Sequence, residues 1–170
     1  LLQRLEKEQI TCLGLGREEL DLQNPQSSSK LANILNPLDT LVVISAKAPC
    51  KNHQMFLQNI EMMKNVCDAL QQKVAKQVIY ISSDAVYADS MEKISEQSLA
   101  APGSLHGVMH LAREIMLQSV LEKESLLILR PSLLYGLNDP HNGYGPNSFY
   151  RLAKANKKIE LFGNGEEKRD

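Results

Sequence analysis

Three polar residues stand at the end of an apolar run in the middle of the chain. The run at 77–82, Gln-Val-Ile-Tyr-Ile-Ser, ends in Ser82, and Ser83 and Asp84 follow it. A nearly continuous apolar run is typical of a strand buried on both faces, and parallel sheets bind ligands beyond the carboxyl ends of their strands. Two hydroxyl groups and a carboxylate at that position would project into such a cleft. Serine and aspartate also form ordinary turns, so these residues alone leave the plain end of a strand as an alternative.

A second candidate for chemistry is a pair of histidines, His106 and His110. In a helix, a spacing of four residues places both side chains on one face. Imidazole exchanges protons near neutral pH, because its unperturbed pKa is about 6.5. The pair would also suit half of a metal site, but no third ligand stands at a matching distance, and the glutamate of a His-Glu-x-x-His motif is absent. We therefore expect no metal, and an ordinary solvent-facing position remains open for both histidines.

The apolar residues around these candidates predict the elements that position them. Short apolar runs at 40–44, 77–82 and 125–129, with further ones at 9–13 and 159–162, predict strands. Between them, apolar residues recur at intervals of three and four, which gives each segment one apolar stripe and predicts helices. These helical segments are Phe56–Leu70, Leu105–Val120 and a shorter one near Ser148–Ala155.

Strands that alternate with helices predict an α/β fold with a doubly wound, Rossmann-like parallel sheet. We expect a single domain over residues 1–170, incomplete at both ends. Residues 1–8 are typical of the end of a helix, and no strand with a glycine loop precedes them. The sequence Gly14-x-Gly16 lacks the third glycine and the following helix of a dinucleotide loop. Since that loop holds the pyrophosphate, we expect these residues alone to bind NAD(P) weakly.

The composition narrows the class of protein. Of the 170 residues 43% are hydrophobic and 23% are charged, which excludes disordered, collagen-like and disulfide-stapled chains. The net charge is −1, with no block of like charge, and no apolar run approaches the ~20 residues that span a bilayer. We therefore expect neither a nucleic-acid partner nor a membrane partner. The three cysteines are odd in number, and the N-terminus lacks the apolar core of a signal peptide, so we expect free thiols in a cytoplasmic protein.

Several motifs in a fixed order resemble the extended short-chain dehydrogenase/reductase family. They are Val-Ile-Tyr-Ile-Ser-Ser-Asp-Ala-Val-Tyr at 78–87, Arg-Pro-Ser-Leu-Leu-Tyr-Gly at 130–136, and the residues Glu96, Pro102 and Glu114. The most similar subgroups are the NAD-dependent epimerases/dehydratases of nucleotide sugars and the dTDP-4-dehydrorhamnose reductases. The resemblance implies a nucleotide-sugar substrate, NAD or NADP as cofactor, and hydride transfer at a sugar carbon. It leaves a homodimer open.

The resemblance also implies roles for single residues. Ser83 matches the serine or threonine that hydrogen-bonds the reacting oxygen of the sugar. His106 and His110 occupy the positions of the catalytic Tyr-x-x-x-Lys pair, whose tyrosine exchanges the proton and whose lysine acidifies it and binds the nicotinamide ribose. The remaining matches are Asp21 and Leu22 near the adenine, Ala46 lining the cofactor, Pro131 and Leu133 beside the nicotinamide, and Asp84 and Arg169 on the substrate, where Arg169 would clamp the diphosphate.

Departures from the family pattern leave two classes of function open. Imidazole lacks the reach of a phenol, and His110 would be mostly neutral where lysine is charged. Ala85 replaces the glutamate of the sugar 4,6-dehydratases, which argues against dehydration. Arg17 would favour NADP, in contrast to the NAD preference of epimerases. The chain is therefore expected to be a nicotinamide-dependent epimerase or reductase, or else a nucleotide-binding family member without catalysis that acts as a sensor or partner subunit.

Overall fold

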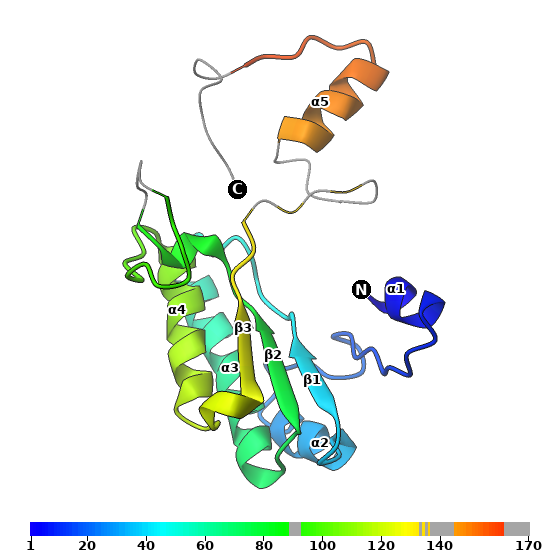
Figure 1. Cartoon of the computed structure of the whole chain (residues 1–170), viewed down its shortest axis with the longest axis vertical. Coiled ribbons are helices and arrows are strands. Elements are labelled where there is room, and N and C mark those ends of the chain that lie inside the picture. Colours follow the sequence, from blue (N-terminus) through cyan, green and yellow to red (C-terminus); the bar gives the residue numbers. More distant parts are fainter. Residues whose placement is uncertain (89–92, 133, 135, 137–144, 162–170) are drawn as a thin grey trace. The chain divides into compact units, whose positions relative to one another are not determined.

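The computed structural model describes residues 1–88, 93–132, 134, 136 and 145–161. The chain divides into two compact units, Leu1–Leu129 and Arg130–Asp170 (Figure 1). The expectation of a single domain stays a prediction.

A parallel sheet forms the centre of the first unit. Its three strands lie in the order β1-β2-β3, and Ile79 of the middle strand pairs with Val42 on one side and Leu127 on the other. The α/β class and the parallel, Rossmann-like sheet are confirmed, as are the strands predicted at 40–44, 77–82 and 125–129. The doubly wound arrangement, with helices on both faces of the sheet, stays a prediction. The observed strands are β1 (Thr40–Val43), β2 (Gln77–Ile81) and β3 (Leu126–Leu129).

Two further strand predictions are wrong. Residues 9–13 form no strand, and neither do residues 159–161, the described part of the run 159–162. Ile10 and Leu13 are 53% and 69% exposed, so the first of these segments is not covered on both faces. An apolar run becomes a strand only where a neighbour completes its backbone hydrogen bonds, and within the described residues the segment 9–13 pairs with none.

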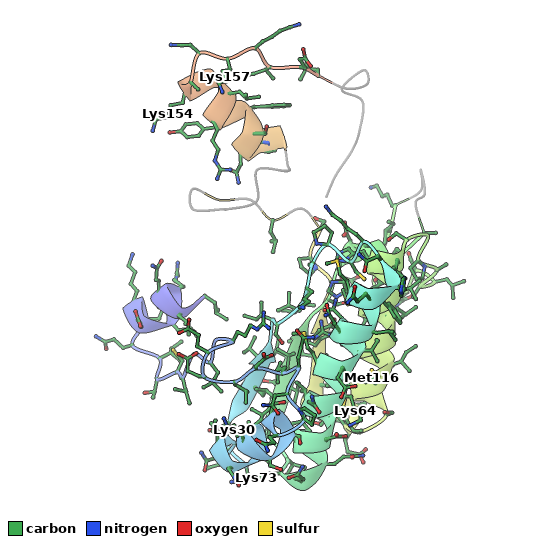
Figure 2. All side chains as sticks on the ribbon, turned by 180° about the vertical axis from the view of Figure 1, so that it is seen from behind. Lys30, Lys64, Lys73, Met116, Lys154 and Lys157 are labelled. Atoms are coloured by element: carbon green, nitrogen blue, oxygen red, sulfur yellow. The ribbon has the colours of Figure 1, made fainter. Side chains whose placement is uncertain are left out.

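Two long helices connect the strands. α3 (His53–Gln72) follows β1, and α4 (Leu105–Gln118) lies between β2 and β3 along the chain. They confirm the helices predicted over Phe56–Leu70 and Leu105–Val120. Seen from behind (Figure 2), α3 lies in front of the sheet, and Lys64 on its outer side has a side chain that is 55% exposed.

Both long helices cover the same face of the sheet (Figure 1). Val78 and Tyr80, alternate residues of β2, are fully buried on this face, among core residues that include Met63 of α3 and Leu117 of α4. The opposite face is more open, since Leu129 of β3 is 43% exposed. The core therefore lies between one face of the sheet and the two helices that connect its strands.

Two short helices precede β1. α1 (Leu2–Lys7) agrees with the helix end expected over residues 1–8. α2 (Ser27–Ile34) is not predicted by the sequence pattern, because its buried apolar residues are few and its first turn is a run of serines. Leu31 and Ala32 are buried where α2 contacts α3.

The second unit contributes one described helix, α5 (Gly145–Lys154), which confirms the helix predicted near Ser148–Ala155. The chain leaves the helix through Asn156, whose φ of +50° is left-handed. The backbone N–H of Lys157 then donates to the carbonyl of Leu152 at 2.9 Å. This is a common way for a helix to satisfy its last carbonyl groups.

A glycine sets how closely α4 approaches the end of β2. Gly107 lies in the first turn of α4, and a Cβ atom added there would overlap the carbonyl oxygen of Ala85 and lie 2.7 Å from Cβ of Pro102. Ala85 belongs to a 3-10 turn, Asp84–Val86, directly after Ser83. Only a residue without a side chain therefore lets α4 and this turn meet.

We expect Gly107→Ala to lower the free energy of unfolding by roughly 1–3 kcal/mol, because a methyl group forced against backbone costs about that much. This loss outweighs the gain of up to about 1 kcal/mol that alanine offers over glycine in a helix. Gly103→Ala is the matched control, since a methyl group there meets no atom within 4 Å. Urea unfolding curves compare the three proteins, and equal midpoints for the two variants would contradict the close approach.

Candidate functional site

The carboxyl end of β2 presents the predicted serines in two different settings. Ser82 is buried, and its hydroxyl donates to the Glu114 carboxylate of α4. Ser83 is half-buried, and its Oγ accepts from the N–H of Ala85 at 3.1 Å and donates to Oδ1 of Asp84 at 3.1 Å. Ser82 therefore fastens the strand to α4, whereas Ser83 and Asp84 lie at the edge of the sheet where a ligand would bind.

The two histidines lie on one face of α4, as their spacing predicts. Their ring centres are 4.7 Å apart and the rings are nearly perpendicular. Nδ1 of His106 accepts a hydrogen bond from the backbone N–H of Cys50 at 3.3 Å. His106 therefore joins α4 to the segment that follows β1. Its neighbour Gly107 lies against the turn that begins after Ser83.

His110 is buried in a polar cluster between α4 and the sheet. Its Nδ1 lies 2.8 Å from the Tyr80 hydroxyl, and it is 5% exposed. The guanidinium of Arg113 lies over the ring of Tyr80, with Cζ 5.2 Å from the ring centre. Nη2 of Arg113 donates to the carbonyl of Ser45 at 2.7 Å. A solvent-facing position is therefore wrong for His110.

The segment after β1, which contains Ala46, is held mainly by α3. The side chain of Asn59 accepts from the N–H of Lys47 at 2.9 Å and donates to the carbonyl of the same residue at 3.0 Å. Ala46 itself is half-buried. Ala46, Ser83 and His106 thus belong to one region at the carboxyl edge of β1 and β2.

Other predicted residues lie elsewhere. Asp21 accepts from the N–H of Gln23 and pairs with Arg17 at 3.3 Å, and the carbonyl of Leu22 accepts from Nδ2 of Asn65 at 2.8 Å. Within the described residues no hydrogen bond or ion pair joins this segment to Ser83 or the histidines, and the charge of Lys47, next to Ala46, acts on the Asp21 carboxylate. Pro131 belongs to the second unit, and Leu133 and Arg169 lie outside the described residues.

Comparison with known proteins decides the family. The whole chain, residues 1–170, matches the model of the NAD dependent epimerase/dehydratase family. The chain belongs to this family. It is 24% identical over 156 residues to the uncharacterized UDP-glucose epimerase YtcB of Bacillus subtilis, a match that covers 84% of this chain and 48% of the relative.

Solved structures show the same fold. The UDP-N-acetylglucosamine 4-epimerase of Bacillus cereus superimposes with a TM-score of 0.71 at 24% identity, over 93% of this chain and 58% of that protein. The dTDP-4-dehydrorhamnose reductase of Bacillus anthracis, solved in complex with NADP, gives a TM-score of 0.73 at 23% identity, over 92% and 56%. The chain therefore spans about half the length of the relatives that it matches.

Burial sets the charge of this epimerase-family site. Desolvation lowers the pKa of His110 to about 4, and the charges of His106 and Arg113 act in the same direction. Desolvation also raises the pKa of Tyr80 to about 12. It lowers the pKa of His106, against the opposing effect of the Asp84 carboxylate. Near pH 7 both histidines are therefore neutral, and Arg113 is the cation buried beside them.

Four residues of the site are not among those predicted from the sequence: Tyr80, Arg113, Asn59 and Gly107. Tyr80 is indistinguishable by pattern from the apolar residues of its strand, and Asn59 is a polar residue on a helix predicted from its apolar stripe. Arg113 offered a usable signal, because it follows His110 by three residues and so lies on the same helical face. Among the described residues, no group of three or more His, Cys, Asp or Glu side chains is arranged to hold a metal ion. In the same part of the chain, no helix has the length and apolar character needed to cross a membrane.

We expect His110 to make stability depend on pH. Its pKa is about 4 in the folded state and about 6.5 when unfolded. As the pH falls, the unfolded chain binds this proton first. The contribution of neutral His110 to the free energy of unfolding is therefore complete above pH 6.5 and is lost toward pH 4. The loss is about 2 kcal/mol by pH 5.

Urea unfolding at pH 7 and pH 5 measures this loss. His110→Gln keeps an acceptor for Tyr80 but cannot titrate, so its stability should fall less between the two pH values. His53→Gln is the control, because His53 is exposed at the start of α3 and its variant should show the pH dependence of the parent. The same pH dependence in all three proteins would contradict a buried neutral His110.

Proposed function

We propose that the chain forms the catalytic region of a nucleotide-sugar epimerase or reductase, of the isomerase or oxidoreductase class, that uses NAD or NADP in the cytoplasm. One observation supports this beyond the family match: the turn with Ser83 packs against the first turn of α4, which contains His106. In this arrangement, the hydroxyl of Ser83 positions the reacting oxygen of the sugar.

The described residues fit a nicotinamide cofactor only in part. Ala46 offers a small, half-buried side chain on a segment fixed by Asn59, which suits the flat surface of a cofactor. His110 does not fit the role of the ribose-binding lysine, because it is buried, neutral and hydrogen-bonded to Tyr80. The cofactor, when bound, would accept and return a hydride, while this chain contributes orientation of the sugar by Ser83.

The activity is tested by incubation with UDP-glucose, UDP-N-acetylglucosamine or a dTDP-linked keto sugar, each with NAD(H) and NADP(H). A reductase changes the absorbance of the nicotinamide band, whereas an epimerase returns the hydride and is detected by chromatography of the converted sugar nucleotide. We expect Ser83→Ala to lower turnover about 10²–10³-fold, the usual effect of removing one hydrogen-bond donor to a reacting oxygen. Ser83→Thr keeps the hydroxyl and should retain most of the activity. Equal rates for Ser83→Ala and the parent would contradict the proposed role of Ser83.

A specific observation favours a second candidate function, a family member that binds a nucleotide sugar without turnover and acts as a sensor or partner subunit. Neutral His110 cannot supply the positive charge that makes a neighbouring phenol acidic. Binding of a nucleotide sugar with neither a converted sugar nucleotide nor a change in nicotinamide absorbance would identify this second function.

Restoring the family pair should raise turnover. Proton transfer by a positioned group typically raises the rate ~10²–10⁴-fold. We therefore expect a large gain in turnover from His106→Tyr combined with His110→Lys, and little gain from either change alone. The gain also depends on Arg113, because its positive charge makes a second cation at position 110 unfavourable. We therefore expect a further gain when Arg113→Met is added to the double variant.

Steady-state rates of the parent, both single variants, the double and the triple variant, measured across pH, decide this prediction. A double variant slower than the parent, together with parent activity that titrates near neutral pH, would mean that histidine has taken over the role of the tyrosine.

A further inference from the structure

Each histidine of the site uses Nδ1 as a hydrogen-bond acceptor. Nδ1 of His106 faces the backbone N–H of Cys50 at 3.3 Å. A backbone N–H can only donate, so this nitrogen holds no proton, and the proton of the neutral ring is on Nε2. The tautomer of His106 is therefore set by the main chain of the segment after β1.

His110 is held in the same tautomer by Tyr80. The Tyr80 side chain is fully buried, so its O–H needs an acceptor inside the protein. Nδ1 of His110 lies within hydrogen-bond distance of this hydroxyl, at 2.8 Å, and the guanidinium of Arg113 lies over the ring. The Glu114 carboxylate acts on Tyr80 through its charge. Arginine has no acceptor. The hydroxyl of Tyr80 therefore donates to Nδ1, and the proton of His110 is on Nε2.

The Nε2 atoms of both rings remain available. Among the described residues, no hydrogen bond forms at either Nε2 atom, and the buried side-chain atoms without a partner are Oγ of Ser27 and Nε and Nη1 of Arg113. Neither Nε2 atom is among these enclosed atoms, so each keeps an accessible edge although the His110 ring as a whole is buried, and the two ring centres are 4.7 Å apart.

We infer that His106 and His110 are a pair of N–H donors that bind oxygen atoms of the sugar of the ligand, and that neither transfers the proton of the reaction. This inference rests on the proposed function for the identity of the ligand. A neutral imidazole that gave up its Nε2 proton would become an imidazolate, and its basic lone pair, on Nδ1, is already occupied. Fixed N–H donors of this kind stabilise a partial negative charge on a sugar oxygen. Tyr80 is then a positioning residue, because it holds His110 as a donor.

The tautomers are measured directly on the full chain. Long-range ¹H–¹⁵N spectra of protein labelled with ¹⁵N-histidine distinguish a ring nitrogen that bears a proton from one that does not. At pH 7 we expect His106 and His110 each to be protonated on Nε2 alone. In Tyr80→Phe, His110 should become a mixture of tautomers while His106 stays unchanged, and exposed His53 serves as the internal reference. A proton on Nδ1 of either histidine in the parent, or a charged ring, would overturn the inference.

Binding of the sugar is tested with UDP-glucose, with UDP as the control that lacks the sugar. UDP-glucose should shift the Nε2 resonances and UDP should not. His106→Ala should weaken UDP-glucose binding about tenfold, the effect of one hydrogen bond of about 1.4 kcal/mol, and His106→Gln, which keeps an N–H donor, should bind within about threefold of the parent. Binding of UDP-glucose without any Nε2 shift would overturn the inference. If UDP-glucose, UDP-N-acetylglucosamine and a dTDP-linked keto sugar all fail to bind, the proposed function fails, and the tautomers of the free protein still decide the inference.

Discussion

The guanidinium of Arg113, enclosed between the sheet and α4, determines which charges the neighbouring residues of the site can carry. Arg113 is fully buried, with one hydrogen bond to the carbonyl of Ser45 and its charge over the ring of Tyr80. A buried charge is costly unless polar groups surround it. Within the described residues, Nε and Nη1 of Arg113 have no partner, so the compensation comes from few contacts. A second cation beside it would add repulsion where little water screens it, which explains why a neutral histidine is compatible with position 110.

The other contacts of α4 serve to hold this cluster in place. The absence of a side chain at Gly107 lets the helix reach the turn after β2, and Ser82 binds Glu114 farther along the same helix. These contacts fix how closely α4 packs against the sheet. Because Ser83 and His106 lie on the two sides of this contact, the geometry of the site follows from helix docking rather than from flexible loops.

Sequence patterns predicted the parts of the fold that depend on apolar periodicity. The strands of the sheet and the two long helices are of this kind, and so is the shared face of His106 and His110. The strand predicted over residues 9–13 is wrong because a strand also needs a neighbouring strand to pair with. The sequence of the segment itself does not show whether such a neighbour exists. The buried face of α4 was harder to predict. Its fully enclosed residues include Arg113 and Glu114. Their charges suggest positions in solvent, and their burial is favourable because of partners at the carboxyl ends of β1 and β2, which the sequence of α4 alone does not reveal.

The segment between β1 and α3 is held largely through its main chain. Arg113 binds the carbonyl of Ser45, Asn59 binds both backbone groups of Lys47, and His106 accepts from the N–H of Cys50. Side chains on the helices thus replace the neighbouring strand that would otherwise satisfy this backbone. Much of the path of the segment is therefore set by α3 and α4, to which its own side chains add the hydrogen bond from Lys47 to Gln58 and the buried thiol of Cys50. Ala46 takes no part in these contacts, so a different side chain at that position can alter what lines the site while the backbone keeps its path.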